Sequence, residues 1–216
     1  MQLHHSGTRT SEETRAVTPS APSAIRHFRT GVVPRALSLK EIRDLITAYG
    51  EAALRAKRSG FDGVEVHGGH GYLICQFLSP RANRRNDEYG GSVRNRARFA
   101  CDIMKEIKRV AGADYPVSFR VSASEFAEGG TILEETLEQV PFFVEAGADG
   151  EQHIAVLHGH VRFVGAVHAE HADKLAVARR IGAQSHQSVG AGKTQRAHQL
   201  CEFGRRIAED HAAAGV

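Results

Sequence analysis

The longest helical repeat of apolar residues lies between residues 38 and 58. Apolar side chains recur there three or four positions apart, which is the spacing of one face of a helix. They are Leu39, Ile42, Leu45, Ile46, Tyr49, Ala53 and Leu54. Ser38 precedes this run and Glu41 follows it three positions later, the pattern of a capping box. Gly60 stands where a residue with positive φ commonly ends a helix. We therefore predict a helix over 38–58.

Strands and helices alternate along the first 154 residues. Short apolar strands are predicted at 1–5, 64–66, 116–121 and 148–154, with further helices at 93–110 and 131–146. A long loop is predicted at 68–91, and Ser92 is the expected N-cap of the helix that follows it. This alternation is typical of an α/β fold with parallel strands and right-handed crossovers. Both a (β/α)₈ barrel and a doubly wound sheet have that order of elements.

The positions of two polar residues favour the barrel. His67 and Arg120 each fall at the C-terminal end of a predicted strand, which is where barrel active sites are built. No Gly-x-Gly-x-x-Gly turn follows any predicted strand, so the dinucleotide-binding fingerprint is missing. A complete barrel needs about 250 residues and eight βα units. We expect a partial TIM (β/α)₈ barrel of about four βα units within residues 1–150, followed by an atypical C-terminal tail over 151–216.

The predicted tail differs in composition from the rest of the chain. All six prolines and twelve of the fourteen Phe and Tyr residues precede residue 151, whereas eight of the thirteen histidines follow it. Such a segment has few large apolar side chains with which to build a core. It is interpreted either as a solvated tail or as the product of a shifted reading frame, splicing or truncation.

Composition excludes several classes of protein. The chain has 216 residues, of which 41% are hydrophobic and 25% charged, so wholesale disorder is excluded. No apolar run approaches the roughly 18 residues of a membrane helix, and the start lacks a signal peptide. Cys75, Cys101 and Cys201 are too scattered for a disulfide framework. The net charge is only +3. We expect a cytoplasmic protein that binds neither membranes nor nucleic acid.

The residues with the richest chemistry follow the strand at 64–66. His67, His70 and Tyr72 place two imidazoles and a phenol within six residues, with glycines at 68, 69 and 71 between them. Two imidazoles can donate hydrogen bonds to a carbonyl oxygen, and a phenol can give a proton near neutral pH. The glycines would let a flat ligand approach the backbone. This set of groups suits polarising a carbonyl and protonating the carbon next to it.

This region also resembles a known family. The segment Gly60–Phe99 reads GFDGVEVHGGHGYLICQFLSPRANRRNDEYGGSVRNRARF. It resembles the Old Yellow Enzyme family of flavin oxidoreductases, including its 2,4-dienoyl-CoA reductase-like branch. Residues 2–7 (QLHHSG) and 34–38 (PRALS) are similar to two further family motifs. The resemblance continues through 116–122 and 125–135 and fades after about residue 150.

The resemblance implies a role for each matching residue. Gln2 would hydrogen-bond the pyrimidine edge of the flavin, and Arg120 would lie beside its N1/O2 region. His67 and His70 would bind the carbonyl oxygen of an activated alkene, the small-molecule substrate. Tyr72 would give the proton after hydride leaves flavin N5. The cofactors implied are FMN and NAD(P)H, with NADH or NADPH as the reductant.

Departures from the family pattern keep alternatives open. The chain begins at what would be the third family strand, and the end of the motif at 2–7 is altered to Ser6-Gly7-Thr8-Arg9. An alternative is therefore a catalytically inactive, truncated or frame-shifted fragment. Half a barrel has unpaired sheet edges, so such a chain would aggregate or associate with another half, as in a homo-oligomer. His67 and His70 lack a nearby third ligand, so no metal site is predicted, although a histidine-rich metal-binding protein is a weaker alternative.

Overall fold

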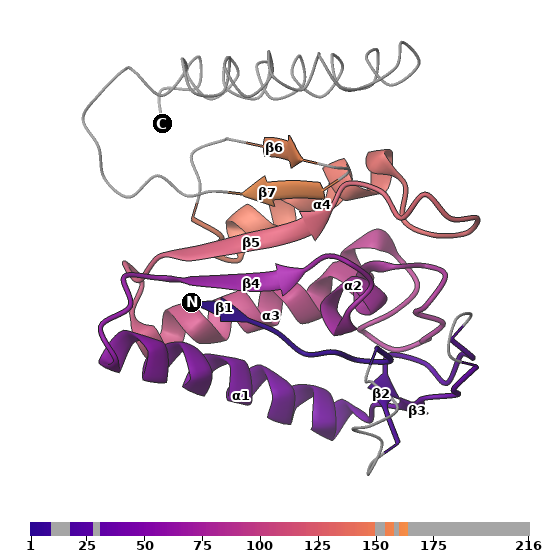
Figure 1. Ribbon diagram of the computed structural model, residues 1–216, viewed down its shortest axis with the longest axis horizontal. Coiled ribbons are helices and arrows are strands. Elements are labelled where there is room, and N and C mark those ends of the chain that lie inside the picture. Colours follow the sequence, from indigo (N-terminus) through magenta and orange to yellow (C-terminus); the bar gives the residue numbers. More distant parts are fainter. Residues whose placement is uncertain (10–17, 28–30, 150–153, 158–159, 164–216) are drawn as a thin grey trace.

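The fold is a five-stranded sheet with helices packed against it (Figure 1). The computed structural model describes residues 1–9, 18–27, 31–149, 154–157 and 160–163. The sheet has the order β1-β4-β5-β7-β6, and a separate pair joins β2 to β3. The strands are β1 (Gln2–Leu3), β2 (Ser20–Ala21), β3 (Arg35–Ala36), β4 (Val64–Gly68), β5 (Val117–Ser122), β6 (Ile154–Leu157) and β7 (His160–Phe163). The helices are α1 (Leu39–Arg58), α2 (Leu73–Leu78), α3 (Val93–Ala111) and α4 (Leu133–Glu145). The predicted α/β class is confirmed.

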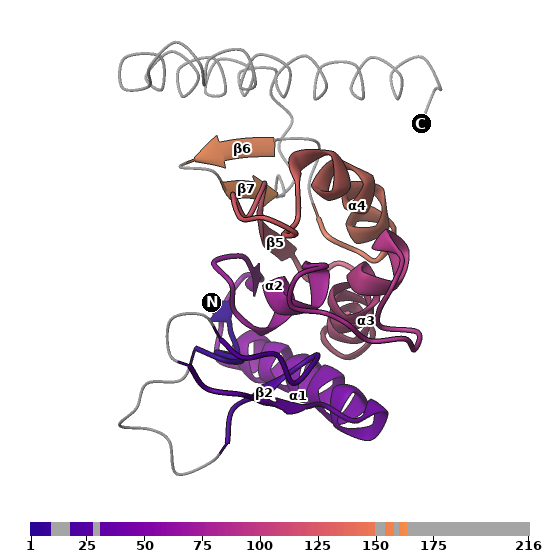
Figure 2. The same cartoon turned by 90° about the vertical axis from the view of Figure 1, so that its right-hand side faces the viewer.

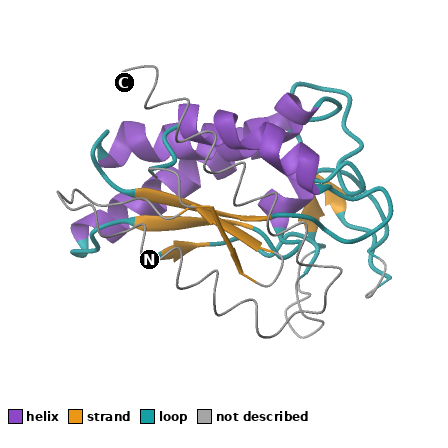
Figure 3. Cartoon of the chain, turned by 90° about the horizontal axis from the view of Figure 1, so that it is seen from above, coloured by secondary structure: helices purple, strands orange, loops and turns teal. Residues whose placement is uncertain are grey.

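The helices gather on one face of the sheet (Figure 3). β1, β4 and β5 are parallel neighbours, as predicted. Helix α3 packs between α1 and α4, and the three follow one another across the sheet (Figure 2). Val66 of β4 and Phe119 of β5 are fully buried in this layer, as is Phe99 of α3. The described part of the chain therefore has a sheet with one helical face, whereas a doubly wound sheet has helices on both.

Local capping signals predict the main helices to within a few residues. The Ser38 hydroxyl accepts the Glu41 N–H at 3.3 Å, and a Glu41 carboxylate oxygen accepts the Ser38 N–H at 2.9 Å. Helix α1 follows directly, and Gly60 has a φ of +85° just beyond its end. The Ser92 hydroxyl likewise accepts the Asn95 N–H at 3.2 Å before α3. These contacts satisfy N–H groups that have no partner within the helix.

The prediction of an uninterrupted loop over 68–91 is wrong. Helix α2 lies within it, and all six of its residues are buried. It contacts α3, β4 and β2, so it is enclosed by other elements. The stretch Leu73–Leu78 (LICQFL) is too short and too uniformly apolar for periodicity to identify a helix. Its conformation follows from tertiary packing and not from an amphipathic pattern.

The prediction that residues 148–154 form the next parallel strand is also wrong. Residues 148–149 are not in a strand, residues 150–153 lie outside the described residues, and β6 begins at Ile154. β6 pairs antiparallel with β7, which pairs antiparallel with β5. Only two residues separate β6 from β7, whereas a parallel connection needs a crossover of a dozen or more. The described strands thus form three parallel βα units and a hairpin, not four parallel units.

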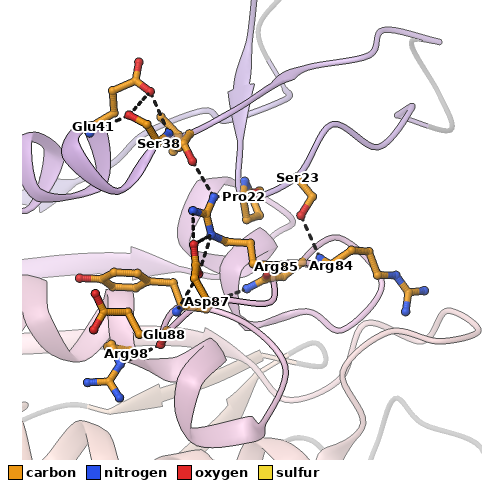
Figure 4. Close-up of polar contacts among 12 residues, drawn as sticks. Pro22, Ser23, Ser38, Glu41, Arg84, Arg85, Asp87, Glu88 and Arg98 are labelled. Atoms are coloured by element: carbon orange, nitrogen blue, oxygen red, sulfur yellow. Dashed lines mark hydrogen bonds and ion pairs between the residues drawn. The ribbon is translucent and has the colours of Figure 1, made fainter.

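The segment between α2 and α3 is fixed by side chains that bond to the backbone (Figure 4). Arg85 donates to the carbonyls of Pro22 at 2.9 Å and Leu37 at 2.6 Å, and it forms an ion pair with Asp87 at 2.6 Å. A Cβ on Gly90 would lie 2.3 Å from the Arg85 carbonyl oxygen, so only glycine fits there. This part of the family-like motif therefore has an architectural role.

Three sequence predictions remain, on the C-terminal tail, on membrane-spanning helices and on the cellular location. Of the predicted tail over 151–216, only β6 and β7 are described, and they lie in the sheet, so the divergent character of the tail stays a prediction. Within the described helices, none is both long and apolar enough to cross a bilayer. The cytoplasmic location also stays a prediction.

Candidate functional site

A row of polar side chains crosses the sheet face opposite the described helices. In the strand register, Gln2 of β1 lies beside Glu65 of β4, and His67 of β4 lies beside Arg120 of β5. The residues that alternate with them belong to the buried core: Leu3, Val66 and Phe119. Because successive strand side chains point to opposite faces, the four polar residues share the face away from the helices. The sequence-predicted residues Gln2, His67 and Arg120 thus meet on one surface.

The two predicted histidines are in direct contact. His67 Nε2 and His70 Nδ1 are 3.0 Å apart, and the rings' centroids are 4.9 Å apart. The Tyr72 ring lies 5.4 Å from that of His67. His70 has a φ of +60°, which is uncommon for a residue with a side chain, and its N–H donates to Ser122 Oγ at 3.1 Å. The turn after β4 therefore brings His67, His70 and Tyr72 into one cluster.

A cavity of about 450 Å³ opens over this cluster. Its lining residues are Gln2, His4, Arg9, His67, His70 and Tyr72. Four of the five predicted site residues are among them. The fifth, Arg120, is half-buried and lies directly across the strand pair from His67.

His67 is held in its neutral form by its surroundings. Its pKa is lowered from the usual 6.5 to about 4, mainly by burial and then by the nearby His70, His4 and Arg120, with Glu65 opposing the shift. A neutral imidazole has one N–H donor and one acceptor nitrogen. Its Nδ1 is buried and has no hydrogen-bond partner in the described part of the chain. His67 can therefore hydrogen-bond a polar ligand without adding a full positive charge.

This shift predicts a pH-dependent stability. The folded-state pKa lies below the unfolded value, so the unfolded chain binds more protons between pH 6.5 and about 4. The His67 contribution to stability is thus complete above pH 6.5 and is lost as the pH falls toward 4. In urea unfolding at pH 7.5 and 5.0, His67→Gln should lose less stability on acidification than the parent chain. An NMR titration placing the His67 pKa near 6.5 would contradict this.

Two further residues of the cluster were missed from the sequence. The ring of His4 lies edge-on to Tyr72 with centroids 4.3 Å apart, and the Arg9 guanidinium carbon lies 5.6 Å from the Tyr72 ring centroid. Burial lowers the pKa of His4. His4 could have been found, because it lies two residues after Gln2 and so shares its face of the strand. Arg9 follows the strand in an irregular segment, where no periodic signal exists.

The glycines of the turn have a packing role that the sequence did not indicate, while their predicted role in ligand approach stays a prediction. A Cβ on Gly68 would lie 2.4 Å from the Phe119 ring, and one on Gly69 would lie 3.3 Å from Ser122 Oγ. Gly71 has a φ of +73°, and the space beside it is taken by the Arg9 guanidinium. The neighbouring side chains thus occupy the space that these glycines leave.

A buried glutamine ties this turn to the segment after β1. Gln76 Nε2 donates to Thr8 Oγ1 at 2.9 Å and to the Gly71 carbonyl at 2.8 Å. Its Oε1 accepts the Thr8 N–H at 3.4 Å. Gln76 is only 6% exposed, so these groups have little access to water. The amide therefore fixes the backbone immediately before Tyr72.

Gln76→Leu should destabilise the fold by about 2 kcal/mol, because it leaves the buried polar groups of Thr8 and Gly71 without their partner. The matched control is Gln139→Leu in α4. Gln139 is fully buried, and neither side-chain polar atom has a partner in the described part of the chain. That replacement should leave stability unchanged or raise it. Urea unfolding followed by circular dichroism compares the two, and equal losses would contradict the bracing role of Gln76.

The polar face has features that fit a flavin ring. Arg120 carries a fixed positive charge, which suits a ring system that becomes negative on reduction. Gln2 is exposed at the rim, where its Nε2 donates to Glu65 at 2.6 Å. In the described residues, no group of three or more His, Cys, Asp or Glu side chains is placed to hold a metal.

Comparisons with known proteins place these features in one family. The chain matches the NADH:flavin oxidoreductase / NADH oxidase family over residues 1–208. It is 49% identical over 148 residues to NADH oxidase from Thermoanaerobacter brockii, covering 68% of this chain and 23% of that protein. It is 44% identical over 145 residues to cinnamate reductase from Clostridium sporogenes, covering 60% of this chain and 22% of that protein.

Solved structures give the same result. A 2-naphthoyl-CoA reductase in complex with 2-naphthoyl-CoA matches with a TM-score of 0.63 and 33% identity, over 68% of this chain and 24% of that one. An Old Yellow Enzyme homologue from Zymomonas mobilis matches with a TM-score of 0.59 and 31% identity, over 68% and 44%. The resemblance seen in the sequence is confirmed. The chain spans less than a quarter of the length of the two curated relatives.

Proposed function

Because the chain belongs to the NADH:flavin oxidoreductase / NADH oxidase family, we propose that it functions as an FMN-dependent, NAD(P)H-oxidising ene-reductase. The reaction is reduction of an activated C=C bond in an α,β-unsaturated carbonyl or enoyl thioester. Flavin and NADH are the redox partners named by the family. The observation that carries the substrate class is the contact of His67 with His70 at 3.0 Å, beside Tyr72.

The finer fold proposed is part of a (β/α)₈ barrel formed by residues 1–150. Parallel β1, β4 and β5 with helices on one face support it, since a barrel wall has its helices outside and its polar site inside. Residues 151–216 are proposed as a divergent tail, of which β6 and β7 extend the sheet beside β5. His67 and Arg120 lie near the C-terminal ends of β4 and β5, and His70 and Tyr72 follow β4, where barrel active sites are built.

His67, His70 and Tyr72 would have different roles toward the substrate. A carbonyl oxygen would replace the direct contact between His67 Nε2 and His70 Nδ1 and accept hydrogen bonds from both. Neutral imidazoles suit this task because they donate without repelling each other. Tyr72 would then deliver its hydroxyl proton to the carbon next to the carbonyl. The ring contact with His4 would keep the phenol oriented.

Gln2 and Arg120 would hold the flavin on the polar face of the sheet. FMN, when bound, supplies the hydride that completes reduction of the C=C bond, after its own reduction by NAD(P)H. The half-buried Arg120 has a permanent charge, so it offers the flavin a cation whose strength does not vary with pH. This assignment rests on the position of Arg120 across from His67.

The visible absorption spectrum of the purified chain tests the proposal. The full chain is incubated with excess FMN and desalted, and we expect flavin bands close to a stoichiometric amount. Arg120→Met should then retain less flavin than Arg109→Met, a replacement at an exposed arginine of α3. A colourless parent chain would instead support the alternative, a catalytically inactive fragment of such an enzyme.

A further inference from the structure

A second cavity adjoins the histidine–tyrosine cluster. Its volume is about 580 Å³, and it shares Arg9 and His70 with the cavity over the cluster. Segments from far apart in the sequence form its walls: residues 8–9 after β1, residues 21–27, α2 with the turn after it, and the β5–α4 connection. A ligand held at His67 and His70 would therefore extend into this cavity, which we call the side cleft.

Positive charge predominates around the side cleft. Three arginines line it, Arg9, Arg26 and Arg81, together with the imidazole of His27. Glu125 is the single carboxylate among its described lining residues, and one of its oxygens accepts the Thr131 N–H at 2.7 Å. Planar guanidinium groups match carboxylate and phosphate oxygens with paired hydrogen bonds. The balance of charge favours an anionic ligand.

Two exposed apolar side chains complete the side cleft. Ile25 is 36% exposed and Phe126 is 77% exposed, and both line it. Phe126 also has a φ of +50°, although bulky residues rarely adopt positive φ. Strained backbone of this kind clusters at ligand-binding positions. The cleft thus offers an aromatic surface next to cationic groups, which suits a ligand with an apolar body and a charged end.

We infer that the side cleft binds the anionic end of an elongated unsaturated substrate whose carbonyl lies at His67 and His70. This inference rests on the proposed function, because it names the substrate class of the same site. The apolar body of the substrate lies along Phe126, and a carboxylate or phosphate at its far end meets Arg26 and Arg81. The ligand chemistry is an anionic, aryl- or alkyl-bearing enone or enoyl derivative.

Direct binding to the full chain tests this by isothermal titration calorimetry, with no turnover required. The probes are 4-(3-oxobut-1-enyl)benzoate, an enone with a remote carboxylate, and its neutral methyl ester. The acid should bind about five- to tenfold more tightly than the ester, which is the weight of one or two solvent-exposed ion pairs. Sodium chloride at about 0.5 M should reduce this preference, since salt screens exposed charges.

Arginine variants locate the effect. The double variant Arg26→Gln/Arg81→Gln should bind the acid no more tightly than the ester. Arg84→Gln is the matched control, because Arg84 is exposed near Arg81 but does not line the side cleft. Sodium pyrophosphate and sodium benzoate are then compared as competitors of the acid. If pyrophosphate displaces the acid at the lower concentration, the anionic end is a phosphate. If benzoate does so, the anionic end is a carboxylate.

The outcomes separate this inference from the proposed function. Equal binding of acid and ester, or a preference that survives the double variant, would overturn the inference. If neutral enones are reduced without any such preference, the proposed function stands and the inference fails. If the acid binds through Arg26 and Arg81 while the chain retains no FMN, the cleft is confirmed and the ene-reductase proposal fails.

Discussion

Tyr72→Phe is expected to slow alkene reduction by the FMN-loaded protein about 10²-fold or more, the usual contribution of a general acid. The replacement removes only the hydroxyl and keeps the ring that contacts His4 at 4.3 Å and His67 at 5.4 Å. Reduction of the flavin by NAD(P)H needs no proton from Tyr72, so that half-reaction should keep its rate. Stopped-flow absorbance at the flavin band, with each half-reaction mixed separately, measures both.

The comparison between the two half-reactions distinguishes a proton-donor role of Tyr72 from a structural role. A merely structural role for Tyr72 would slow both, because misplacing the turn would disturb everything bound over it. Tyr115→Phe is the control: the Tyr115 hydroxyl donates to the Phe61 carbonyl at 3.0 Å, and the residue does not line the candidate site. It should change neither rate. Equal losses in the two half-reactions of Tyr72→Phe would remove Tyr72 from the role of proton donor.

Local sequence signals account for the parts of the fold that were predicted correctly. The capping pair Ser38 and Glu41 and the N-cap Ser92 act within three residues of themselves, so a single sequence suffices to find them. His67 and Arg120 were found because the C-terminal ends of parallel strands lie together at one edge of the sheet, where barrel active sites are built. His70 and Tyr72 were found because they follow the same strand as His67 within six residues, and the match to a family added Gln2.

The features that were missed depend on contacts between distant residues. Gln76 braces Thr8 across 68 positions of sequence, and no local pattern indicates such a partner. Helix α2 is buried on all sides, so it has no amphipathic period to read. The sequence suggested ligand access for the glycines at 68, 69 and 71, but it could not show that Gly68 makes room for Phe119 on the neighbouring strand. Periodicity reports which face is apolar, not which residues meet.

Arg96→Met is expected to lower the free energy of unfolding by about 3 kcal/mol. Arg96 lies in the family-like motif at the start of α3 and is only 5% exposed. Its guanidinium donates to the carbonyls of Leu78 at 3.0 Å and Gly91 at 2.6 Å, and it pairs with Glu135 of α4 at 2.8 Å. Methionine fills similar space but satisfies none of these oxygens, so the loss measures polar contacts and not a cavity.

Glu135 makes this loss larger than that of an ordinary ion pair. Its other carboxylate oxygen is buried without a hydrogen-bond partner in the described part of the chain, so removing Arg96 leaves the carboxylate with no cation. Arg109→Met on the same helix is the control. The Arg109 side chain is 69% exposed and pairs with Glu106, so its removal should cost far less than that of Arg96.

Urea unfolding of both variants at pH 7.5 decides between two roles for this part of the motif. A large loss confined to Arg96→Met would mean that the motif specifies how the α2 turn and α4 dock on α3, and hence where the turn carrying His70 and Tyr72 lies. Similar small losses in both variants would contradict that role. The resemblance to the family over residues 93–99 would then have a cause other than stability. A functional role for Arg96 would be the next hypothesis to test.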